Sequence, residues 1–104
     1  IDASDSPSHI YFANRANAFL ELGQHAKCIT DCNQAIAIEP TYIKAYYRKT
    51  LAHFNLDEAE AAKTTLEEAQ KVDPNHDFVK ELQEQLTRME EEKLHPTPKK
   101  EERK

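Results

Sequence analysis

Apolar residues recur along this chain with a helical period, three and four residues apart. The first stripe comprises Ala13, Ala16, Phe19, Leu20 and Leu22, and the second comprises Cys28, Cys32, Ala35 and Ile36. Only Gly23-Gln24 separates the two stripes, and so short a link joins two antiparallel helices. The pattern therefore predicts a helical hairpin over residues 8–40.

The same pattern returns after 34 residues. Pro40 and Pro74 are 34 residues apart, and an acidic residue precedes each of them. At this offset aromatic residues match aromatic residues and small residues match small ones, as in the pairs Phe12 and Tyr46, and Ala35 and Ala69. A fixed period of this length is typical of stacked repeats, so we expect a second hairpin over residues 41–74.

Capping residues predict where the later helices begin. Thr41 is placed to cap a third helix that runs to about Phe54, and Asp57 with Glu60 forms a capping box for the fourth. Asn75 is placed to cap a fifth helix. That helix carries its apolar residues on one face: Phe78, Val79, Leu82, Leu86 and Met89.

The predicted organisation has five parts. They are a linker from an earlier repeat over 1–7, one repeat over 8–40, a second over 41–74, a capping helix over 75–94 and a disordered charged tail over 95–104. Because the first residue is Ile1, we expect the chain to be an internal segment of a longer protein. Without the earlier repeat, the outer face of the first helix would be bare, so Ile10, Tyr11 and Ala18 become candidates for self-association.

Particular residues of each repeat match a known family pattern. In the first repeat these are Phe12, Ala16, Phe19, Gly23, Cys28, Ala35 and Pro40; in the second they are Tyr46, Ala62, Leu66, Ala69 and Pro74. In these positions the segment 8–74 resembles the tetratricopeptide repeat (TPR) family, although Thr50, His53 and Asp57 depart from its pattern. The resemblance implies an all-α, right-handed solenoid of helix–turn–helix repeats with a C-terminal capping helix.

Composition excludes several classes of function. The 104 residues include a single Gly and carry a net charge of -5, so there is neither a glycine-rich phosphate loop nor an overall basic field for nucleic acid. No apolar run approaches the ~20 residues of a membrane span. No catalytic constellation is evident, so we expect neither an enzyme nor a cofactor. Two cysteines without a secretory signal favour a reducing, cytosolic or nuclear setting, and of these we expect the cytoplasm.

Local charge points to an anionic ligand. Between Pro40 and Asp57 the chain holds three basic residues, Lys44, Arg48 and Lys49, and no acid. Lys44 and Arg48 share one helix face, and Asn14 holds the register position of Arg48 in the first repeat. The first helices of stacked hairpins line a concave groove. We therefore expect an ammonium, a guanidinium and an amide to face one hollow there, and these groups hold carboxylates.

The stretches FANRANAF and KAYYRK also resemble the carboxylate-clamp subclass of TPR domains, which occurs in co-chaperones. That resemblance implies that Asn14, Lys44 and Arg48 bind the acidic C-terminal peptide of heat-shock chaperones, as three of five clamp residues. The other two would belong to a preceding repeat. Tyr47 is a candidate wall of the groove for an apolar side chain of the peptide.

Two alternative functions remain open. The repeats could be a scaffold for a folded partner, as in ubiquitin-ligase adaptors of the SGT type, or the targeting arm of a larger enzyme.

His25, Cys28 and Cys32 share a helix face, but a zinc site needs a fourth ligand or an open water position. We therefore predict no metal site, and expect both cysteines to be reduced thiols in the core.

Overall fold

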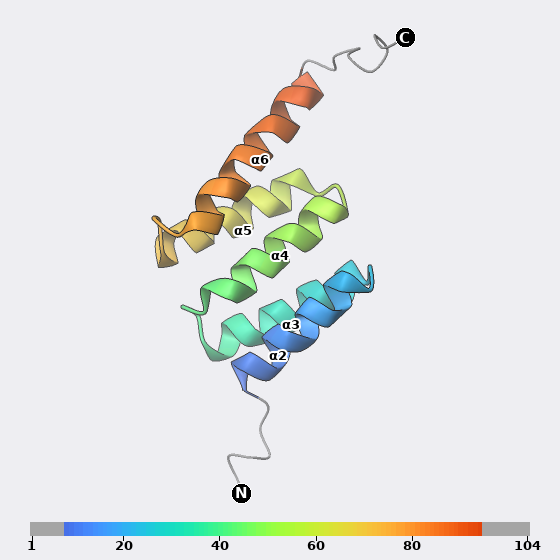
Figure 1. Cartoon of the computed structure of the whole chain (residues 1–104), viewed down its shortest axis with the longest axis vertical. Coiled ribbons are helices and arrows are strands. Elements are labelled where there is room, and N and C mark those ends of the chain that lie inside the picture. The colour runs from blue at the N-terminus through green and yellow to red at the C-terminus, as the bar shows by residue number, and fades with distance from the viewer. Residues whose placement is uncertain (1–7, 95–104) are drawn as a thin grey trace, which may run out of the picture.

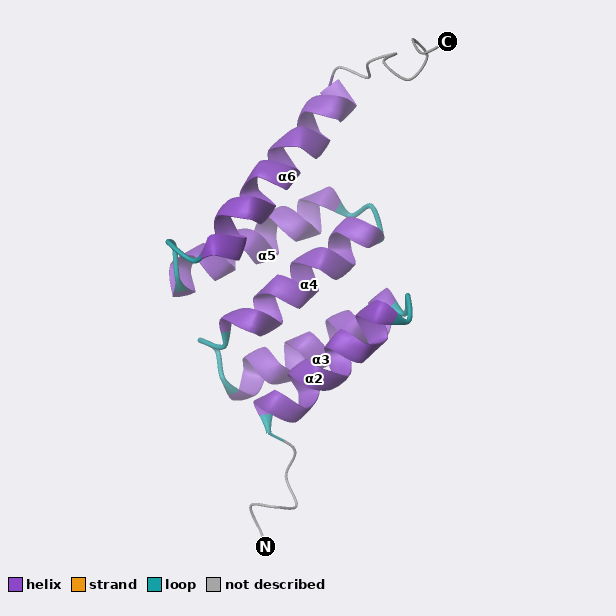
Figure 2. Ribbon diagram, in the orientation of Figure 1, coloured by secondary structure: helices purple, strands orange, loops and turns teal. Residues whose placement is uncertain are grey.

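The computed structural model describes residues 8–94, and this part of the chain folds into helices alone (Figure 2). The helices are α2 (His9–Glu21), α3 (His25–Ile38), α4 (Ile43–Asn55), α5 (Ala59–Val72) and α6 (Asp77–Leu94). The predicted linker over 1–7 and the predicted tail over 95–104 lie outside the described residues. None of the described helices is both long and apolar enough to cross a bilayer.

The helices form two layers. Helices α2, α4 and α6 face the viewer in Figure 1, and α3 and α5 lie behind them. Each hairpin pairs one helix of each layer, α2 with α3 and α4 with α5; α3 then packs against α4, and α6 packs against α5 and α4. This arrangement is the expected all-α solenoid with a helix covering its last edge.

The core follows the predicted stripes. The fully buried residues of the first hairpin are small: Ala13, Ala16, Cys28, Cys32 and Ala35. A larger cluster joins α4, α5 and α6, in which the buried residues include Tyr46, Leu66, Val79, Leu82 and Leu86. One predicted position is wrong, because Leu22 follows the end of α2 and its side chain is 69% exposed.

The predicted helix starts need correction. Thr41 does not cap α4: the N-cap is Tyr42, which makes no side-chain cap, and the Thr41 hydroxyl donates to the carboxylate of Glu39. Likewise Asn75 does not cap α6. That helix starts at Asp77, and Nδ1 of His76 accepts a hydrogen bond from the backbone N–H of Phe78 at 3.3 Å.

The predicted capping box at Asp57 is also wrong. Asp57 has φ 62°, and it holds the register position of Gly23, which has φ 79°. Both residues provide the left-handed backbone that turns one helix into the next. Helix α5 therefore begins at Ala59, two residues after Asp57, and its N-cap is Glu58, which makes no side-chain hydrogen bond to the helix.

Candidate functional site

Helix α4 carries only positive charge. Lys44, Arg48 and Lys49 lie on it, and none of its thirteen residues is acidic. Lys44 is exposed, whereas Arg48 and Lys49 are half-buried. Ala45 and Tyr46 anchor the helix in the core, and Lys44 and Arg48, four residues apart, share a face that points away from Tyr46.

Arg48 connects the two hairpins. Its Nη1 donates a hydrogen bond of 2.9 Å to the main-chain carbonyl oxygen of Ala13 on α2. Ala13 immediately precedes Asn14, whose side chain is exposed. The bond therefore holds the guanidinium beside the turn of α2 that carries Asn14, while its other N–H groups remain as donors.

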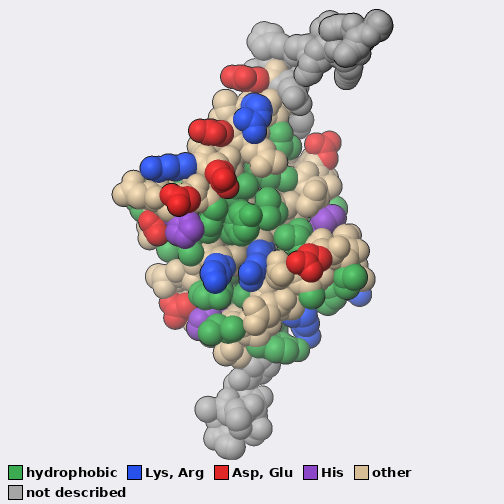
Figure 3. All heavy atoms as spheres, viewed as in Figure 1, with side chains coloured by type: hydrophobic (Ala, Val, Ile, Leu, Met, Phe, Trp, Pro, Cys, Tyr) green, Lys and Arg blue, Asp and Glu red, His purple; other side chains and the backbone are tan. Residues whose placement is uncertain are grey.

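Within the part of the chain that the structure describes, no acid is paired with the positive side chains of α4. Among the side chains that the structure describes, neither Lys44 nor Arg48 takes part in an ion pair. Figure 3 shows two cationic side chains side by side near the middle of the face formed by α2, α4 and α6, next to hydrophobic side chains. A cationic surface with an apolar neighbour suits an anionic ligand that also carries an apolar group.

Tyr47 supplies part of the apolar neighbourhood. Its ring is half-buried and lies 4.5 Å, between centroids, from the ring of Phe78 on α6, with the planes tilted by 41°. The ring of His76 packs on the same Phe78 ring, with 4.4 Å between the two ring centroids. The aromatic wall is therefore shared between α4 and the start of α6.

Arg15, next to Asn14, has a different role. It donates two hydrogen bonds to the Asp31 carboxylate on α3, at 2.7 and 2.9 Å, and one to the Tyr11 hydroxyl at 2.9 Å. The hydrogen bond with Asp31 raises the pKa of Arg15. This guanidinium is thus committed to joining α2 and α3 and is not a free member of the cationic surface.

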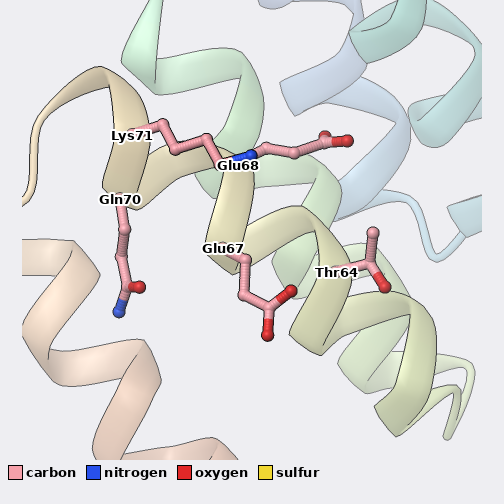
Figure 4. Close-up of a pocket in the computed structure, with 5 residues that line it drawn as sticks. All are labelled: Thr64, Glu67, Glu68, Gln70 and Lys71. Atoms are coloured by element: carbon pink, nitrogen blue, oxygen red, sulfur yellow. The ribbon is translucent and has the colours of Figure 1, made fainter.

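A polar hollow on α5 does not form a comparable site. It has a volume of about 470 Å³ and is lined by Thr64, Glu67, Glu68, Gln70 and Lys71. Figure 4 shows the carboxylates of Glu67 and Glu68 pointing away from each other. Gln70 is engaged with Gln83 of α6 at 2.7 Å. The lining groups therefore do not converge on one ligand.

The three-ligand metal arrangement weighed for His25, Cys28 and Cys32 is not present. Within residues 8–94 no group of three or more His, Cys, Asp or Glu side chains is placed to hold a metal ion. Cys28 and Cys32 are free thiols in the core, as expected from their packing positions.

Sequence reasoning missed three contacts around the groove: the bond from Arg48 to Ala13, the pairing of Arg15 with Asp31, and the packing of Tyr47 on Phe78. One signal was available for the first. Residue 13 is a small alanine, whose side chain leaves the neighbouring α2 backbone unshielded, but the sequence does not say which long side chain reaches it.

Comparison with known proteins identifies the class of this fold. Two tetratricopeptide repeat models match the chain, one over residues 10–42 and the other over residues 43–76. The chain belongs to the tetratricopeptide repeat family.

The similar proteins include members of a narrower group within this family, the co-chaperones. The Hsp70/Hsp90 co-chaperone CNS1 of Saccharomyces cerevisiae is 38% identical over 82 residues, which is 78% of this chain and 21% of that protein. The solved structure of Hsp90 co-chaperone Cns1 superposes with a TM-score of 0.81 at 34% identity, covering 91% of this chain and 30% of that one. The first TPR of Spaghetti (RPAP3), solved bound to the HSP90 peptide SRMEEVD, gives a TM-score of 0.73 at 30% identity over 79% of this chain and 65% of that one. This chain thus spans about a fifth of the curated relative CNS1.

Proposed function

We propose that this chain is a peptide-recognition module of a co-chaperone or adaptor, and that it binds the acidic C-terminal peptide of heat-shock chaperones. Asn14, Lys44 and Arg48 would hold the terminal carboxylate and the acidic side chains. The observation that carries the proposal is the bond from Arg48 to the carbonyl of Ala13. It fixes a guanidinium between the hairpins, beside Asn14 and one turn from Lys44, on a helix without acids.

Electrostatics and shape contribute differently to such binding. Positive groups attract a peptide with several carboxylates and orient its free C-terminus. Charge-assisted hydrogen bonds from Arg48 and Lys44 then retain it. The ring of Tyr47, which rests on Phe78, offers a surface for one apolar side chain of the same peptide. A relative solved with an HSP90 peptide supports this ligand class.

The test is a titration of the chain with a fluorescent peptide that ends in Glu-Glu-Val-Asp. Lys44→Ala is expected to weaken binding at least tenfold, and Lys44→Ala/Arg48→Ala further, because each removes a charged donor to a carboxylate. Amidation of the peptide C-terminus should also weaken binding.

The matched control is Lys63→Ala/Lys71→Ala, which removes two positive charges from α5 instead. Its affinity is expected to stay within about threefold of the wild type, since only the long-range field changes. Equal affinities of the wild type and the Lys44→Ala/Arg48→Ala variant would contradict the clamp. A folded partner that remains bound in excess peptide would favour the scaffold function instead.

The same proposal has two further parts. The chain would act by binding alone, without catalysis of its own; a relative named as a co-chaperone supports this role. It would work in the cytoplasm, where the chaperone tails are available.

A further inference from the structure

The last turn of α2 carries an acid that the proposed carboxylate clamp does not use. Glu21 is the final residue of α2, and its side chain is exposed. It follows Asn14 by two helical turns, so the two residues share one face of the helix. Asn17 lies between them on that face, and its Nδ2 donates a hydrogen bond of 3.3 Å to Oε2 of Glu21. The carboxylate is therefore held on the side of α2 that carries Asn14.

The position of this acid is unfavourable for α2 itself. The C-terminus of a helix carries partial negative charge, so a base is preferred in the last turn and a carboxylate is repelled. The last turn of α2 contains no base. Among the described side chains, Glu21 takes part in no ion pair. A carboxylate that costs its own helix stability and is paired with no base suits a cation that a ligand brings.

The neighbouring helix shows what a ligand meets before it reaches Glu21. One face of α4 carries, at spacings of three and four residues, Lys44, Arg48, Leu51 and Asn55. Leu51 is half-buried and packs against the cluster that joins α4, α5 and α6. Asn55 holds the register position of Glu21 in the second hairpin. Toward the C-terminal ends of α2 and α4, the groove therefore offers cations first, then an apolar side chain, and then a carboxylate.

The length of the groove decides where along a peptide a base must lie. A helix rises 1.5 Å per residue, so Glu21 lies about 10 Å along the axis from Asn14 and about 16 Å from Ile10, the register partner of Lys44. An extended peptide advances about 3.3 Å per residue, so these spans correspond to about three and about five residues. With the terminal residue at the clamp, the base lies between the fourth and the sixth residue from the C-terminus.

We propose that Glu21 selects acidic C-terminal peptides that carry a lysine or arginine as the sixth residue from their end. The inference rests on the proposed function, because Asn14, Lys44 and Arg48 must first hold the acidic end. In a peptide that ends in Glu-Glu-Val-Asp, the fourth residue from the end is itself acidic. The fifth is apolar and contacts Leu51, and the sixth places its cation against the Glu21 carboxylate. The order base, apolar residue, acidic end thus matches the groove.

The test compares two fluorescent peptides that differ at one residue, Ser-Arg-Met-Glu-Glu-Val-Asp and Ser-Ala-Met-Glu-Glu-Val-Asp, by anisotropy titration at low salt. The wild type is expected to bind the arginine peptide about threefold more tightly, which is the effect of an exposed ion pair. Glu21→Gln keeps an acceptor for Asn17 but removes the charge, so it should bind both peptides equally. The preference of the wild type should also disappear at high salt, because salt screens an exposed pair.

The matched control is Glu60→Gln, which removes one exposed acid from α5 and should keep the threefold preference. Because the carboxylate is unfavourable at the end of α2, Glu21→Gln should be at least as stable as the wild type in urea unfolding. If neither peptide binds the wild type, the proposed function fails and this inference fails with it. If the wild type binds both peptides equally, or if Glu21→Gln keeps the preference, the role of Glu21 is overturned and the clamp stands.

Discussion

The α2–α3 hairpin and the α4–α5 hairpin match position by position at an offset of 34 residues, yet they carry different chemistry. On the groove side, Asn14 of the first hairpin corresponds to Arg48 of the second, and the exposed Ile10 corresponds to Lys44. At these two pairs of equivalent positions the positive charge therefore comes from α4 alone. The first hairpin contributes the Ala13 carbonyl that holds Arg48, together with the neutral amide of Asn14.

The outer helices differ just as much. Residues of α5 at its outer face are charged: Glu60, Lys63, Glu67, Glu68 and Lys71. The equivalent residues of α3 carry no charge: Ala26, Ile29, Asn33, Gln34 and Ala37. Both helices nevertheless end before a proline and bury an alanine in the same place, Ala35 or Ala69. The fold thus depends on a few buried positions and leaves the outward ones free for function.

The largest expected difference between the hairpins lies at one buried position, which holds Cys32 in the first and Leu66 in the second. Leu66 is 1% exposed within the cluster that joins α4, α5 and α6. Leu66→Cys removes apolar volume and leaves a cavity, so we expect the free energy of unfolding to fall by about 2 kcal/mol. Urea unfolding followed by circular dichroism measures it.

The same substitution at an exposed site is the control. Leu56 lies on the same hairpin and is 39% exposed, so Leu56→Cys should change stability by less than about 0.5 kcal/mol. If both variants lose equal stability, the second hairpin does not depend on its larger core residue.

The period predicted the fold well because it concerns buried positions. Ala16, Cys28 and Leu66 are buried where the 34-residue match placed them. Helix starts were predicted poorly, because an aspartate can either cap a helix or adopt the left-handed backbone of a turn. Asp57 matches a capping pattern, but its φ of 62° shows that it replaces a glycine. Local pattern alone does not distinguish a cap from a left-handed turn.

The candidate site was predictable only in part. That Lys44 and Arg48 share a face follows from the helical period, and that Asn14 lies in step follows from the repeat. The bond from Arg48 to a main-chain carbonyl and the packing of Tyr47 on Phe78 depend on how closely α4 approaches α2 and α6. Neither approach is encoded in a period, so these contacts required the structure.

A smaller difference in stability is expected between Tyr46 and Phe12, the equivalent residue of the first hairpin. The Tyr46 hydroxyl donates a hydrogen bond of 2.7 Å to the carbonyl oxygen of Pro40, in the link between α3 and α4. Tyr46→Phe copies the first hairpin and leaves that carbonyl without this donor, so we expect a loss of about 1 kcal/mol in urea unfolding. Tyr42→Phe is the control, since no hydrogen bond of its hydroxyl is found among the described residues; a loss as large there would contradict the assignment.

A still smaller difference in stability is expected between the two turns within the hairpins, at Gly23 and at Asp57. Asp57 bears the cost of a left-handed backbone that Gly23 avoids, and an added Cβ at Gly23 would meet no atom within 4 Å. We therefore expect Asp57→Gly to raise the free energy of unfolding by about 0.5 kcal/mol and Gly23→Asp to lower it by a similar amount. For each variant, thermal unfolding and urea unfolding should show a change in stability of the same sign. Two changes of the same sign would show that side-chain contacts, and not the backbone, decide these turns.

The smallest expected effect concerns the end of α3. The Thr41 hydroxyl donates to the Glu39 carboxylate, and this hydrogen bond is the main cause that lowers the pKa of Glu39. Thr41→Val should raise that pKa toward its ordinary value, as measured by a carbon NMR titration of the carboxyl group. A lowered folded pKa stabilises the protein above the unfolded pKa, and this contribution is lost as the pH falls through the folded pKa. The stability difference between wild type and Thr41→Val should therefore exist near neutral pH and vanish in acid. Thr64→Val, whose hydroxyl bonds the Glu60 carbonyl, should leave the Glu39 titration unchanged; if it shifts that curve equally, the hydrogen bond from Thr41 is not the cause.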